Sequence, residues 1–298
     1  MKRLRRWGII GFGEVGSTFA RHLWDHTGRP VVVTDPVLHQ KLPPPHLQQR
    51  LQGVSIRLAA DIEELVGSAD VVLSTVTAGV AEGVGREAAH TWRQGLFIDL
   101  NSTEPGSKQL LAGLFPGDGY IDGSILGAIK GEGAATPVAL AGPRSAEALE
   151  AFQEAGFRAS VTSLKVGGAS ALKLCRSVFM KGLECLFVET LLAARQYDLQ
   201  QPVLETIEET LKAYGLIPMA GMLVTTHAVH CGRRAREMDG AVRMLGEMGL
   251  PSTMSQASRS FLERSSQTGL AEHFSQVVPD RLEEVLEFLS GYDQEKPS

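Results

Sequence analysis

The sequence predicts an α/β protein in which a doubly wound parallel sheet is followed by an all-helical region. The 298 residues suffice for about two domains. The first half alternates short apolar runs with helical patterns, which is typical of parallel strands joined by crossover helices. Strand signals stop near residue 165, and helical periodicity continues to the end. We therefore expect one domain over residues 1–165 and a second over residues 166–298.

The strands are expected where apolar and β-branched residues form short runs with little alternation, as in strands buried on both faces. These runs are residues 7–10, 31–34, 56–59, 71–75, 96–99, 120–125, 137–141 and 158–161. Between them, residues 17–26 and 61–66 are expected to be helical. The successive prolines within residues 42–46 predict a surface loop, because proline fixes the backbone and donates no hydrogen bond.

The helical region is expected to begin with a long interdomain helix. After Gly167 and Gly168, residues 169–197 contain no proline, and Gly182 is their single glycine. A helix of this length would extend for roughly 40 Å and would form the spine of the second domain. Shorter helices should follow, separated by breaks near residues 201–202, 215–218 and 249–251.

Composition narrows the classes of function. Hydrophobic residues make up 43% and charged residues 21% of the chain, which indicates a packed globular protein. The net charge of -5 argues against a protein that coats nucleic acid. No apolar run approaches the roughly 18 residues that span a membrane. The three cysteines are too few for a disulfide framework, which indicates a reducing compartment such as the cytoplasm.

A glycine-rich motif joins the first predicted strand to the first helix. Asp35 ends the second strand about 20 residues further on, which is the context of a Rossmann-type dinucleotide-binding fold. Gly11 permits the tight turn, Gly13 lets the backbone approach a pyrophosphate, and Gly16 lets helix and strand pack closely. The N-terminus of the helix would bind the phosphates. The whole motif is expected to contact the cofactor: Gly11, Phe12, Gly13, Glu14, Val15 and Gly16.

Asp35 bears on the choice of cofactor. A carboxylate at this position accepts hydrogen bonds from the ribose hydroxyls of NAD and repels the 2′-phosphate of NADP. The next basic residue is Lys41, beyond Pro36. NAD is therefore the predicted cofactor, and NADP is the alternative. Asp35 also has a second interpretation, as a turn residue before Pro36.

Several motifs together resemble the β-hydroxyacid dehydrogenases, a family that includes 3-hydroxyisobutyrate dehydrogenase, tartronate semialdehyde reductase and, more distantly, 6-phosphogluconate dehydrogenase. The motifs are residues 11–16, residues 99–105, residues 122–128, and the pair at 167–168 with Lys173. The resemblance covers most of the chain and is closest over the first 175 residues. The helical half is most similar to a phosphogluconate-dehydrogenase-like branch of the family.

The resemblance implies an NAD(P)-dependent oxidoreductase and assigns roles to cofactor residues. Thr75, Val76 and Thr77 would lie along the ribose and nicotinamide side of the cofactor. Ser102 and Thr103 match the family's Ser-Thr pair beside the nicotinamide. Family members also pair through the helical domain, so the resemblance implies a homodimer.

The resemblance also assigns the substrate side. Lys173 matches the lysine that gives a proton to the carbonyl oxygen during reduction and removes it during oxidation. Residues of the 122–128 segment would hold a substrate carboxylate: Ser124, Leu126, Gly127 and Ala128. The sequence departs from the family where Leu126 replaces Ser, Ala128 replaces Gly, Arg176 and Ser177 replace an Asn-Asn pair, and Arg236 and Glu237 replace a Lys-Asp pair. These departures predict retained chemistry on a different small acidic substrate.

Lys173 suits this role on physical grounds. Reduction of a carbonyl places negative charge on its oxygen, so the site needs a proton donor within hydrogen-bond reach. The apolar neighbours Leu172, Leu174 and Val178 are expected to lower the pKa of the Lys173 ammonium toward neutrality.

The residues that follow Lys173 on the same helix face have two interpretations. Arg176 and Ser177 would lie beside Lys173, where Arg176 could bind a carboxylate or phosphate with both of its arms. The alternative is a solvated stripe that also includes Lys181 and Glu184.

Two other clusters of polar residues are weaker candidates for functional sites. His227, His230 and Cys231 have the spacing of helical metal ligands, but no fourth ligand cluster accompanies them, so no metal site is predicted. The basic run at residues 233–236 has the composition of a solvated face. The alternative is that Arg236 reaches substrate or cofactor.

The sequence thus predicts an enzyme that transfers a hydride between NAD(P) and a small hydroxy acid, or its keto or semialdehyde form, with Lys173 as general acid and base. One alternative is a phosphogluconate-type oxidative decarboxylase, which would need a second basic cluster for phosphate. Another is a dinucleotide-binding sensor without turnover, which Leu126 and the missing Asn pair motivate. An imine reductase is less favoured, because such enzymes generally replace the lysine that is retained here.

Overall fold

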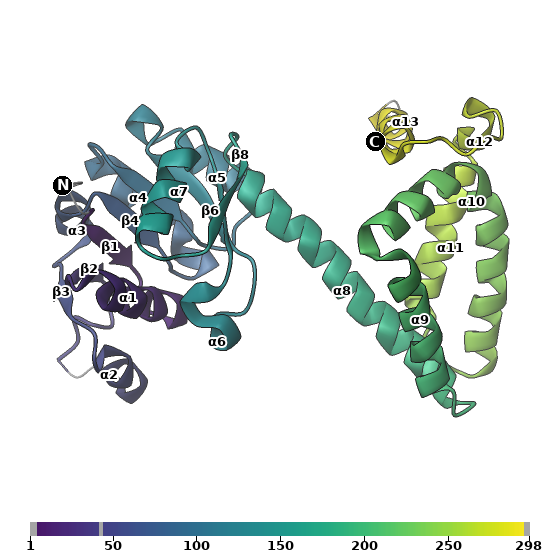
Figure 1. The fold of residues 1–298 in the computed structure, drawn as a ribbon, viewed down its shortest axis with the longest axis horizontal. Helices are drawn as coiled ribbons and strands as arrows, with labels where there is room; N and C mark the ends of the chain where they lie inside the picture. Colours follow the sequence, from purple (N-terminus) through teal and green to yellow (C-terminus); the bar gives the residue numbers. More distant parts are fainter. Residues whose placement is uncertain (1–4, 42–43, 295–298) are drawn as a thin grey trace. The chain divides into compact units, whose positions relative to one another are not determined.

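The computed structural model describes residues 5–41 and 44–294, in two compact units, Met1–Val178 and Phe179–Ser298 (Figure 1). Among these residues, every strand belongs to the first unit. The predicted change from strands to helices near residue 165 coincides with the start of α8 (Gly168–Arg195). The compact units divide further along, within that helix, because its first turns belong to the sheet-containing unit.

The first unit is built on an eight-stranded sheet in the order β3-β2-β1-β4-β5-β6-β7-β8. Its strands are β1 (Trp7–Ile10), β2 (Val31–Thr34), β3 (Ile56–Leu58), β4 (Val71–Ser74), β5 (Leu96–Asp99), β6 (Tyr120–Ile125), β7 (Val138–Ala141) and β8 (Ala159–Ser163). Each predicted run forms a strand, so the predicted fold class is confirmed.

One strand departs from the predicted parallel arrangement. β6 and β7 pair antiparallel, whereas the other neighbouring strands pair parallel. Only α6 (Ile129–Glu132) and the 3-10 turn η2 (Gly133–Ala135) lie between them. A parallel crossover needs a dozen or more residues and usually a full helix, so this short connection returns the chain in the opposite direction.

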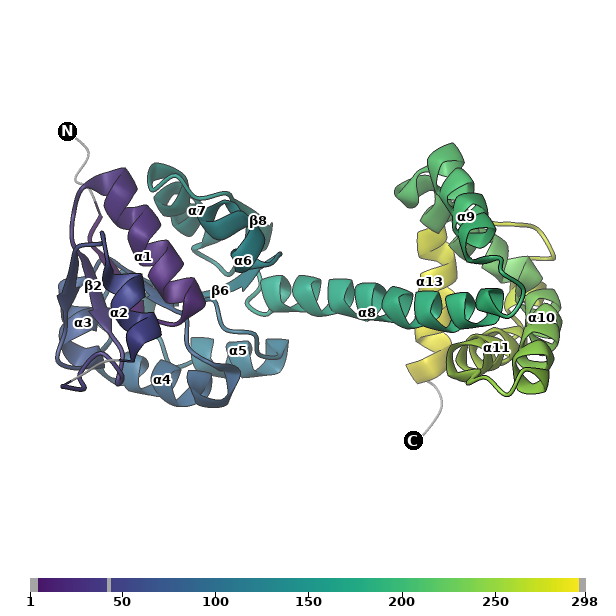
Figure 2. The same ribbon diagram turned by 90° about the horizontal axis from the view of Figure 1, so that it is seen from below.

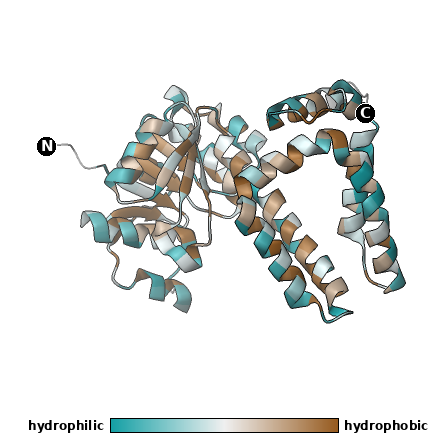
Figure 3. Ribbon diagram, turned by 45° about the vertical axis from the view of Figure 1, so that its right-hand side comes forward, coloured by the Kyte–Doolittle hydropathy of each residue, from teal (hydrophilic) through white to brown (hydrophobic). Residues whose placement is uncertain are grey.

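Helices cover both faces of the sheet. Figure 2 shows α1 (Glu14–Thr27) and α7 (Ser145–Glu154) on one side, with α4 (Ala78–Thr91) and α5 (Pro105–Ala112) on the other. Phe19 and Phe152 bury their rings against the first face, and Trp92 and Phe97 belong to the core of the second. Because both faces are covered, the inner strands are mostly apolar, although polar residues such as Ser74, Asp99 and Asp122 are buried among them. Figure 3 shows hydrophobic residues gathered in the sheet.

Local sequence explains two further helices of this unit. Asp61 caps α3 (Ile62–Ser68) by accepting the N–H of Glu64 at 2.8 Å. The expected loop over residues 42–46 is wrong at Pro45, which begins α2 (Pro45–Leu51). Proline is tolerated at the first position of a helix because its missing N–H would have no partner there. Residues 42 and 43 lie outside the described residues.

The second unit consists of helices. They are the remainder of α8, then α9 (Gln200–Tyr214), α10 (Leu216–Glu247), α11 (Thr253–Ser266), α12 (Leu270–His273) and α13 (Leu282–Gln294). The 28 residues of α8 confirm the predicted long helix. A small core of Ala228, Leu270 and Val285 joins α10, α12 and α13. Among the described residues, no helix is both long and apolar enough to cross a membrane.

Candidate cofactor and catalytic site

The predicted cofactor residues lie at the carboxyl ends of the strands. The strand order reverses between β1 and β4, with β2 and β3 on one side and β5 and β6 on the other. Ligands of open α/β sheets bind at such a switch point. Residues 11–16 follow β1 and residues 75–77 follow β4, so the two predicted loops meet at this edge.

The loop after β1 is closely shaped around its glycines. Gly11 has φ +91°, and its N–H donates to the Thr34 carbonyl at 2.9 Å. A Cβ at Gly16 would lie 2.0 Å from the Gly11 carbonyl oxygen, so glycine is required for α1 to pack here. A Cβ at Gly13 would meet nothing within 4 Å, and α1 begins without a side-chain cap. The open cradle at Gly13 and the free N–H groups of the first turn fit a pyrophosphate.

Asp35 ties this loop to the end of β2. Its Oδ2 accepts the N–H of Phe12 at 2.7 Å, and its Oδ1 accepts the N–H of Val37 at 2.8 Å. The carboxylate therefore shapes the turn, as the second interpretation of Asp35 proposes. Each oxygen keeps a further lone pair for a ribose hydroxyl, so the two interpretations are compatible. In the same loop the Phe12 ring is buried in the core, whereas Glu14 is exposed.

A cavity of about 190 Å³ lies beside the glycine-rich loop. It gathers predicted cofactor, substrate and catalytic residues, namely Val15, Thr75, Val76, Ser102, Gly127 and Lys173. Its remaining walls are Leu100, Asn101, Ile125 and Ile129. Thr75 is fixed by two hydrogen bonds, from its N–H to the Ile10 carbonyl at 2.9 Å and from its hydroxyl to the Gly11 carbonyl at 2.9 Å. Thr77 precedes α4 and is exposed.

Lys173 and Ser102 form a direct hydrogen bond at this cavity. The Lys173 Nζ donates to the Ser102 Oγ at 2.7 Å, although the residues are 71 positions apart. Ser102 follows β5, and Lys173 lies near the start of α8 within the first unit. The fold therefore brings a lysine and a serine together at the wall of the cavity, where a carbonyl oxygen could receive a proton.

Burial lowers the pKa of Lys173, and the positive charge of Lys108 lowers it further. This direction agrees with the expectation from the sequence, but the expected cause is wrong. Leu172, Leu174 and Val178 are exposed in the single chain, because they lie on other faces of α8. Lys173 itself is half-buried where it lines the cavity and contacts Ser102.

The four predicted substrate residues on β6 and in the loop after it lie in different surroundings. Gly127 lines the cavity. Ser124 is buried within β6, and Leu126 packs against Ala139 and the first residues of α8. Ala128 precedes α6 and is exposed. The structure thus brings one of these four residues to the cavity wall.

The remaining predicted residues lie outside the cavity wall. Arg176 is exposed one turn after Lys173, and Ser177 is half-buried. Thr103 has a buried hydroxyl without a hydrogen-bond partner among the described residues. Arg236 is exposed on α10, in the second unit. Within the described ranges, no group of three His, Cys, Asp or Glu side chains is arranged to hold a metal.

Two residues of the site were missed by the sequence analysis. Asn101 lines the cavity and has a buried Oδ1 without a partner among the described residues, although its amide donates to Ser74 at 2.9 Å. Lys108 is fully buried on α5 next to Asp99. The burial of Lys108 could have been predicted from helical spacing, because Lys108 lies three residues before the buried Leu111 and therefore on the same face of α5.

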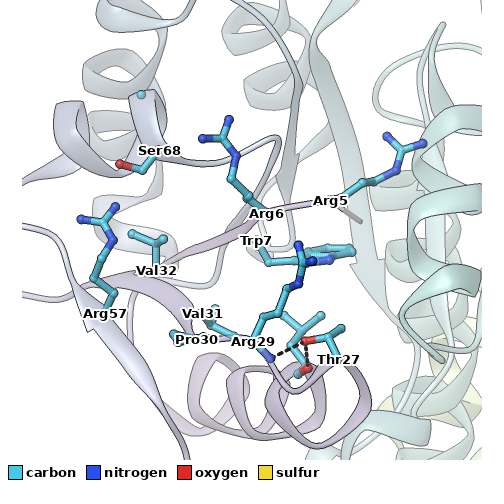
Figure 4. A pocket seen from close by; sticks show the side chains of 12 residues that line it. Arg5, Arg6, Trp7, Thr27, Arg29, Pro30, Val31, Val32, Arg57 and Ser68 are labelled. Atoms are coloured by element: carbon cyan, nitrogen blue, oxygen red, sulfur yellow. Dashed lines mark hydrogen bonds between the residues drawn. The ribbon is translucent and has the colours of Figure 1, made fainter. Parts of the chain in front are cut away.

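A second cavity, of about 390 Å³, lies where β1 and β2 begin, at the opposite end of these strands from the first cavity (Figure 4). Arginines surround it: Arg5, Arg6, Arg29 and Arg57. Arg6 pairs with Asp70 at 2.8 Å, and both Arg5 and Arg57 have glutamate partners. Arg29 lies just beyond the C-terminal end of α1, where a cation complements the helix dipole. This cavity is therefore separate from the predicted site, and its charge is largely balanced.

Comparisons with known proteins agree with the fold. A family model described as a domain of unknown function, DUF1932, matches residues 194–265. An uncharacterised 28.5 kDa protein of Methanothermus fervidus is 27% identical over 233 residues, which cover 78% of this chain and 88% of that protein.

Solved structures extend this likeness to nearly the whole chain. The conserved protein MTH1747, described as structurally similar to 3-hydroxyacid dehydrogenases, is 30% identical, with a TM-score of 0.62. The match covers 88% of this chain and 97% of that one. An imine reductase from Myxococcus stipitatus, solved with NAD+, has a TM-score of 0.72 at 17% identity and covers 97% of this chain and 100% of its own. At that identity the likeness shows the fold alone.

Proposed function

The chain belongs to the 3-hydroxyacid (β-hydroxyacid) dehydrogenase-like family, and from that premise we propose that it is an NAD(P)-dependent oxidoreductase. The proposed reaction transfers a hydride between the nicotinamide and a small hydroxy acid, or its keto or semialdehyde form. The observation that carries the proposal is the hydrogen bond of 2.7 Å from Lys173 to Ser102 at the wall of a cavity beside the glycine-rich loop.

The cofactor would be held by the first unit. Its pyrophosphate fits the cradle at Gly13 and the N–H groups that open α1, and Asp35 has lone pairs available for a ribose hydroxyl. Asp35 supports NAD over NADP. Thr75 and Val76 would line the path toward the nicotinamide, with Ser102 at its end. The bound cofactor would supply or accept the hydride.

Lys173 would hold and move the proton. During reduction its ammonium donates a proton to the carbonyl oxygen as negative charge develops there, and during oxidation the neutral amine removes that proton. The Ser102 hydroxyl fixes the direction of the Nζ. Burial and the nearby Lys108 lower the pKa of Lys173, which makes both protonation states accessible closer to neutral pH. Rates of oxidation should therefore rise with pH through that pKa, and rates of reduction should fall.

The substrate is proposed to be a small acid. Arg176 is exposed one turn beyond Lys173 and is the candidate partner for its carboxylate, with Ser177 beside it. The buried oxygens of Asn101 and Thr103, which have no partner among the described residues, are candidate acceptors for polar groups of the substrate or nicotinamide. Arg236 remains a proposed contact.

The alternatives receive less support. An oxidative decarboxylase of a phosphorylated sugar acid needs a basic cluster near the lysine, whereas the arginine-rich cavity lies where β1 and β2 begin, at the opposite end of these strands. A sensor without turnover would not need a lysine amine desolvated beside a hydroxyl. The hydroxyacid reaction uses both features.

A homodimer that pairs through the helical unit is also proposed. Large apolar side chains are exposed on its helices, including Val188, Ile217 and Phe261. Patches of this kind on a protomer mark surfaces that a partner covers. The three cysteines are free, which supports a reducing compartment such as the cytoplasm.

The test of the proposed function is Lys173→Ala in the full chain. Turnover of the best substrate from a panel of hydroxy acids should fall by on the order of 10²-fold or more, because the proton donor is lost. Binding of NADH, followed by its fluorescence, should change little. Lys181→Ala is the matched control, since Lys181 is an exposed lysine on the same helix. Full turnover in Lys173→Ala would remove this residue from the mechanism, and NADH binding without turnover of any substrate would favour a sensor.

A further inference from the structure

Lys108 is a cation placed inside the first unit without access to solvent. Its side chain is 0% exposed on α5. Its Nζ donates to the Asp99 carbonyl oxygen at 2.7 Å and lies 2.9 Å from Oδ1 of Asp99 and 3.7 Å from Oδ1 of Asp122. A buried charge is costly unless it is paired and hydrogen-bonded, so this lysine depends on both carboxylates.

Asp122 connects Lys108 to the helix that carries Lys173. Asp122 Oδ2 accepts the N–H of Ser170 at 3.0 Å, and its Oδ1 accepts the Ser170 hydroxyl at 2.7 Å. Ser170 lies in the first turn of α8, three residues before Lys173. Because the N–H groups of a first turn have no partner within the helix, this carboxylate caps α8 and fixes its start on β6.

Asp99 connects Lys108 to the serine that receives the hydrogen bond of Lys173. Its Oδ1 accepts the N–H of Asn101 at 2.9 Å, and Ser102 is the next residue. Its Oδ2 accepts the Tyr120 hydroxyl at 2.6 Å, which fixes the carboxylate. Asp99 is also the register partner of Asp122 on the neighbouring strand, so one buried ammonium lies close to both anchors of the site.

We propose that Lys108 is the positioning residue of the candidate site: through Asp99 and Asp122 it holds the Ser102 loop and the first turn of α8 in the register that places the Lys173 amine on the Ser102 hydroxyl. This inference rests on the proposed function, in which Lys173 moves the proton. Lys108 itself contacts neither substrate nor cofactor.

The arrangement has an electrostatic consequence. The buried ionisable groups here are Lys108 on α5, Asp99 on β5, and Asp122 and Tyr120 on β6, while Arg176 is exposed one turn after Lys173 on α8. After burial, the charge of Lys108 is the cause that lowers the pKa of Lys173. Removal of that charge should raise the pKa of Lys173, because its ammonium would no longer be repelled. Loosening of the register without loss of charge should move that pKa in the same direction but by less, so the size of the shift reports the charge of Lys108.

The experiment measures the amine of Lys173 directly. The full chain is labelled with an amine-acylating reagent over a range of pH, and modification of Lys173 is followed by peptide mass spectrometry, with the exposed Lys165 as internal reference. In Lys108→Met the labelling midpoint of Lys173 should move upward by about one pH unit. In the same variant, kcat for oxidation should fall and its pH profile should move with the labelling midpoint.

A second variant keeps every charge and loosens the register. Ser170→Ala removes the hydroxyl bond to Asp122 and should lower kcat about five- to tenfold, with KM nearly unchanged. Its Lys173 midpoint should move in the same direction by less. Thr27→Val is the control, because it removes a hydroxyl in the same unit at the far end of α1. That hydroxyl donates to the Leu23 carbonyl at 2.6 Å and accepts the N–H of Arg29 at 3.2 Å.

The outcomes separate this inference from the proposed function. An unshifted Lys173 midpoint in a folded Lys108→Met overturns the inference. If that variant does not fold, a Ser170→Ala protein that matches Thr27→Val in midpoint and kcat overturns it equally. Labelling needs neither cofactor nor substrate. Shifted midpoints in both Lys108→Met and the charge-keeping Ser170→Ala, in a protein without turnover, support the positioning by Lys108 and remove only the proposed function.

Discussion

The two compact units differ in how they cover their apolar residues. In the first unit the strands of the sheet's interior are buried throughout, between helices on both faces. In the second unit α9 contains no buried residue, and the largest buried cluster joins only Ala228, Leu270 and Val285. Side chains such as Ile217, which is 84% exposed, remain uncovered.

This difference shows where each unit obtains its stability. The sheet buries a core on each of its two faces within one chain, so the geometry of its loops is fixed by the chain itself. The helical unit leaves part of its apolar surface exposed, and an interface with a second copy would cover such a surface. Lys173, Ser102 and the glycine-rich loop accordingly lie in the unit with the larger core, whereas association with a second copy is expected through the other.

The largest change in the free energy of unfolding should come from a methyl group added at a closely packed glycine of the first unit. Gly16→Ala places a Cβ 2.0 Å from the Gly11 carbonyl oxygen, and it should lower the free energy of unfolding by about 3 kcal/mol. Gly240→Ala on α10 meets nothing within 4 Å and should raise that free energy by about 0.5–1 kcal/mol, because alanine favours the helix. Urea unfolding of the two variants measures the contrast, and equal effects would contradict the difference between the units.

A third glycine separates folding from binding. Gly13→Ala also meets no atom within 4 Å, so its unfolding curve should match that of the unchanged protein. Its affinity for NADH should nevertheless fall by about tenfold, since the added methyl group would occupy the cradle for the pyrophosphate. An unaltered affinity would place the phosphates elsewhere.

The next prediction concerns association. Ile217→Glu combined with Leu223→Glu should convert a dimer into a monomer at micromolar concentration, because charge would enter the proposed interface. Leu110→Glu is the control on the first unit, where Leu110 is 71% exposed. Light scattering gives the mass of each variant. A monomeric mass for the unchanged chain would contradict the proposed dimer.

A smaller effect is expected at Glu189, which caps α11. Burial opposes ionisation of this carboxyl, but the hydrogen bonds from Ser255 and Met254 prevail and lower its pKa. Its stabilisation is therefore present above its ordinary pKa of 4.5 and is lost as the pH falls through the lowered value. At pH 7 Glu189→Gln should cost about 1 kcal/mol of unfolding free energy, and this cost should disappear in acid.

The control for this cap is Glu208→Gln. Glu208 forms an exposed pair with Lys212 four residues on, so its loss should change the unfolding free energy by only a few tenths of a kcal/mol. A cost for Glu189→Gln that stays constant between pH 7 and pH 3 would exclude the capping role.

The smallest predicted effect is on cofactor choice. Asp35→Ser should raise the ratio of NADP(H) to NAD(H) affinity by several-fold, because the repulsion of a 2′-phosphate is removed. Asp25→Ser, at an exposed position of α1, serves as the control. The two affinities can be measured by calorimetry. An unchanged ratio would mean that Asp35 only shapes the turn through its bonds to Phe12 and Val37.

Of the residues that line the candidate cavity, Val15 was predicted from the local glycine motif, whereas Thr75, Val76, Ser102, Gly127 and Lys173 were predicted from the family resemblance. The glycines of residues 11–16 stand between a strand and a helix, and that order alone predicts the switch-point loop. Lys173 was found through its motif, but the reason given for its lowered pKa was wrong, because Leu172, Leu174 and Val178 are exposed in the single chain. Which neighbours desolvate a side chain depends on packing that a helical repeat does not encode.

The sequence by itself determined the order of strands and helices along the chain, the place of the glycine-rich loop and the length of α8, since short apolar runs and glycine spacing act over a few residues. Only the tertiary structure decided that β7 reverses its direction, that Leu126 turns into the core, and that Lys108 is buried between Asp99 and Asp122. Those outcomes depend on contacts between distant segments. The cost of burying a charge is met only when the sheet brings the two carboxylates side by side.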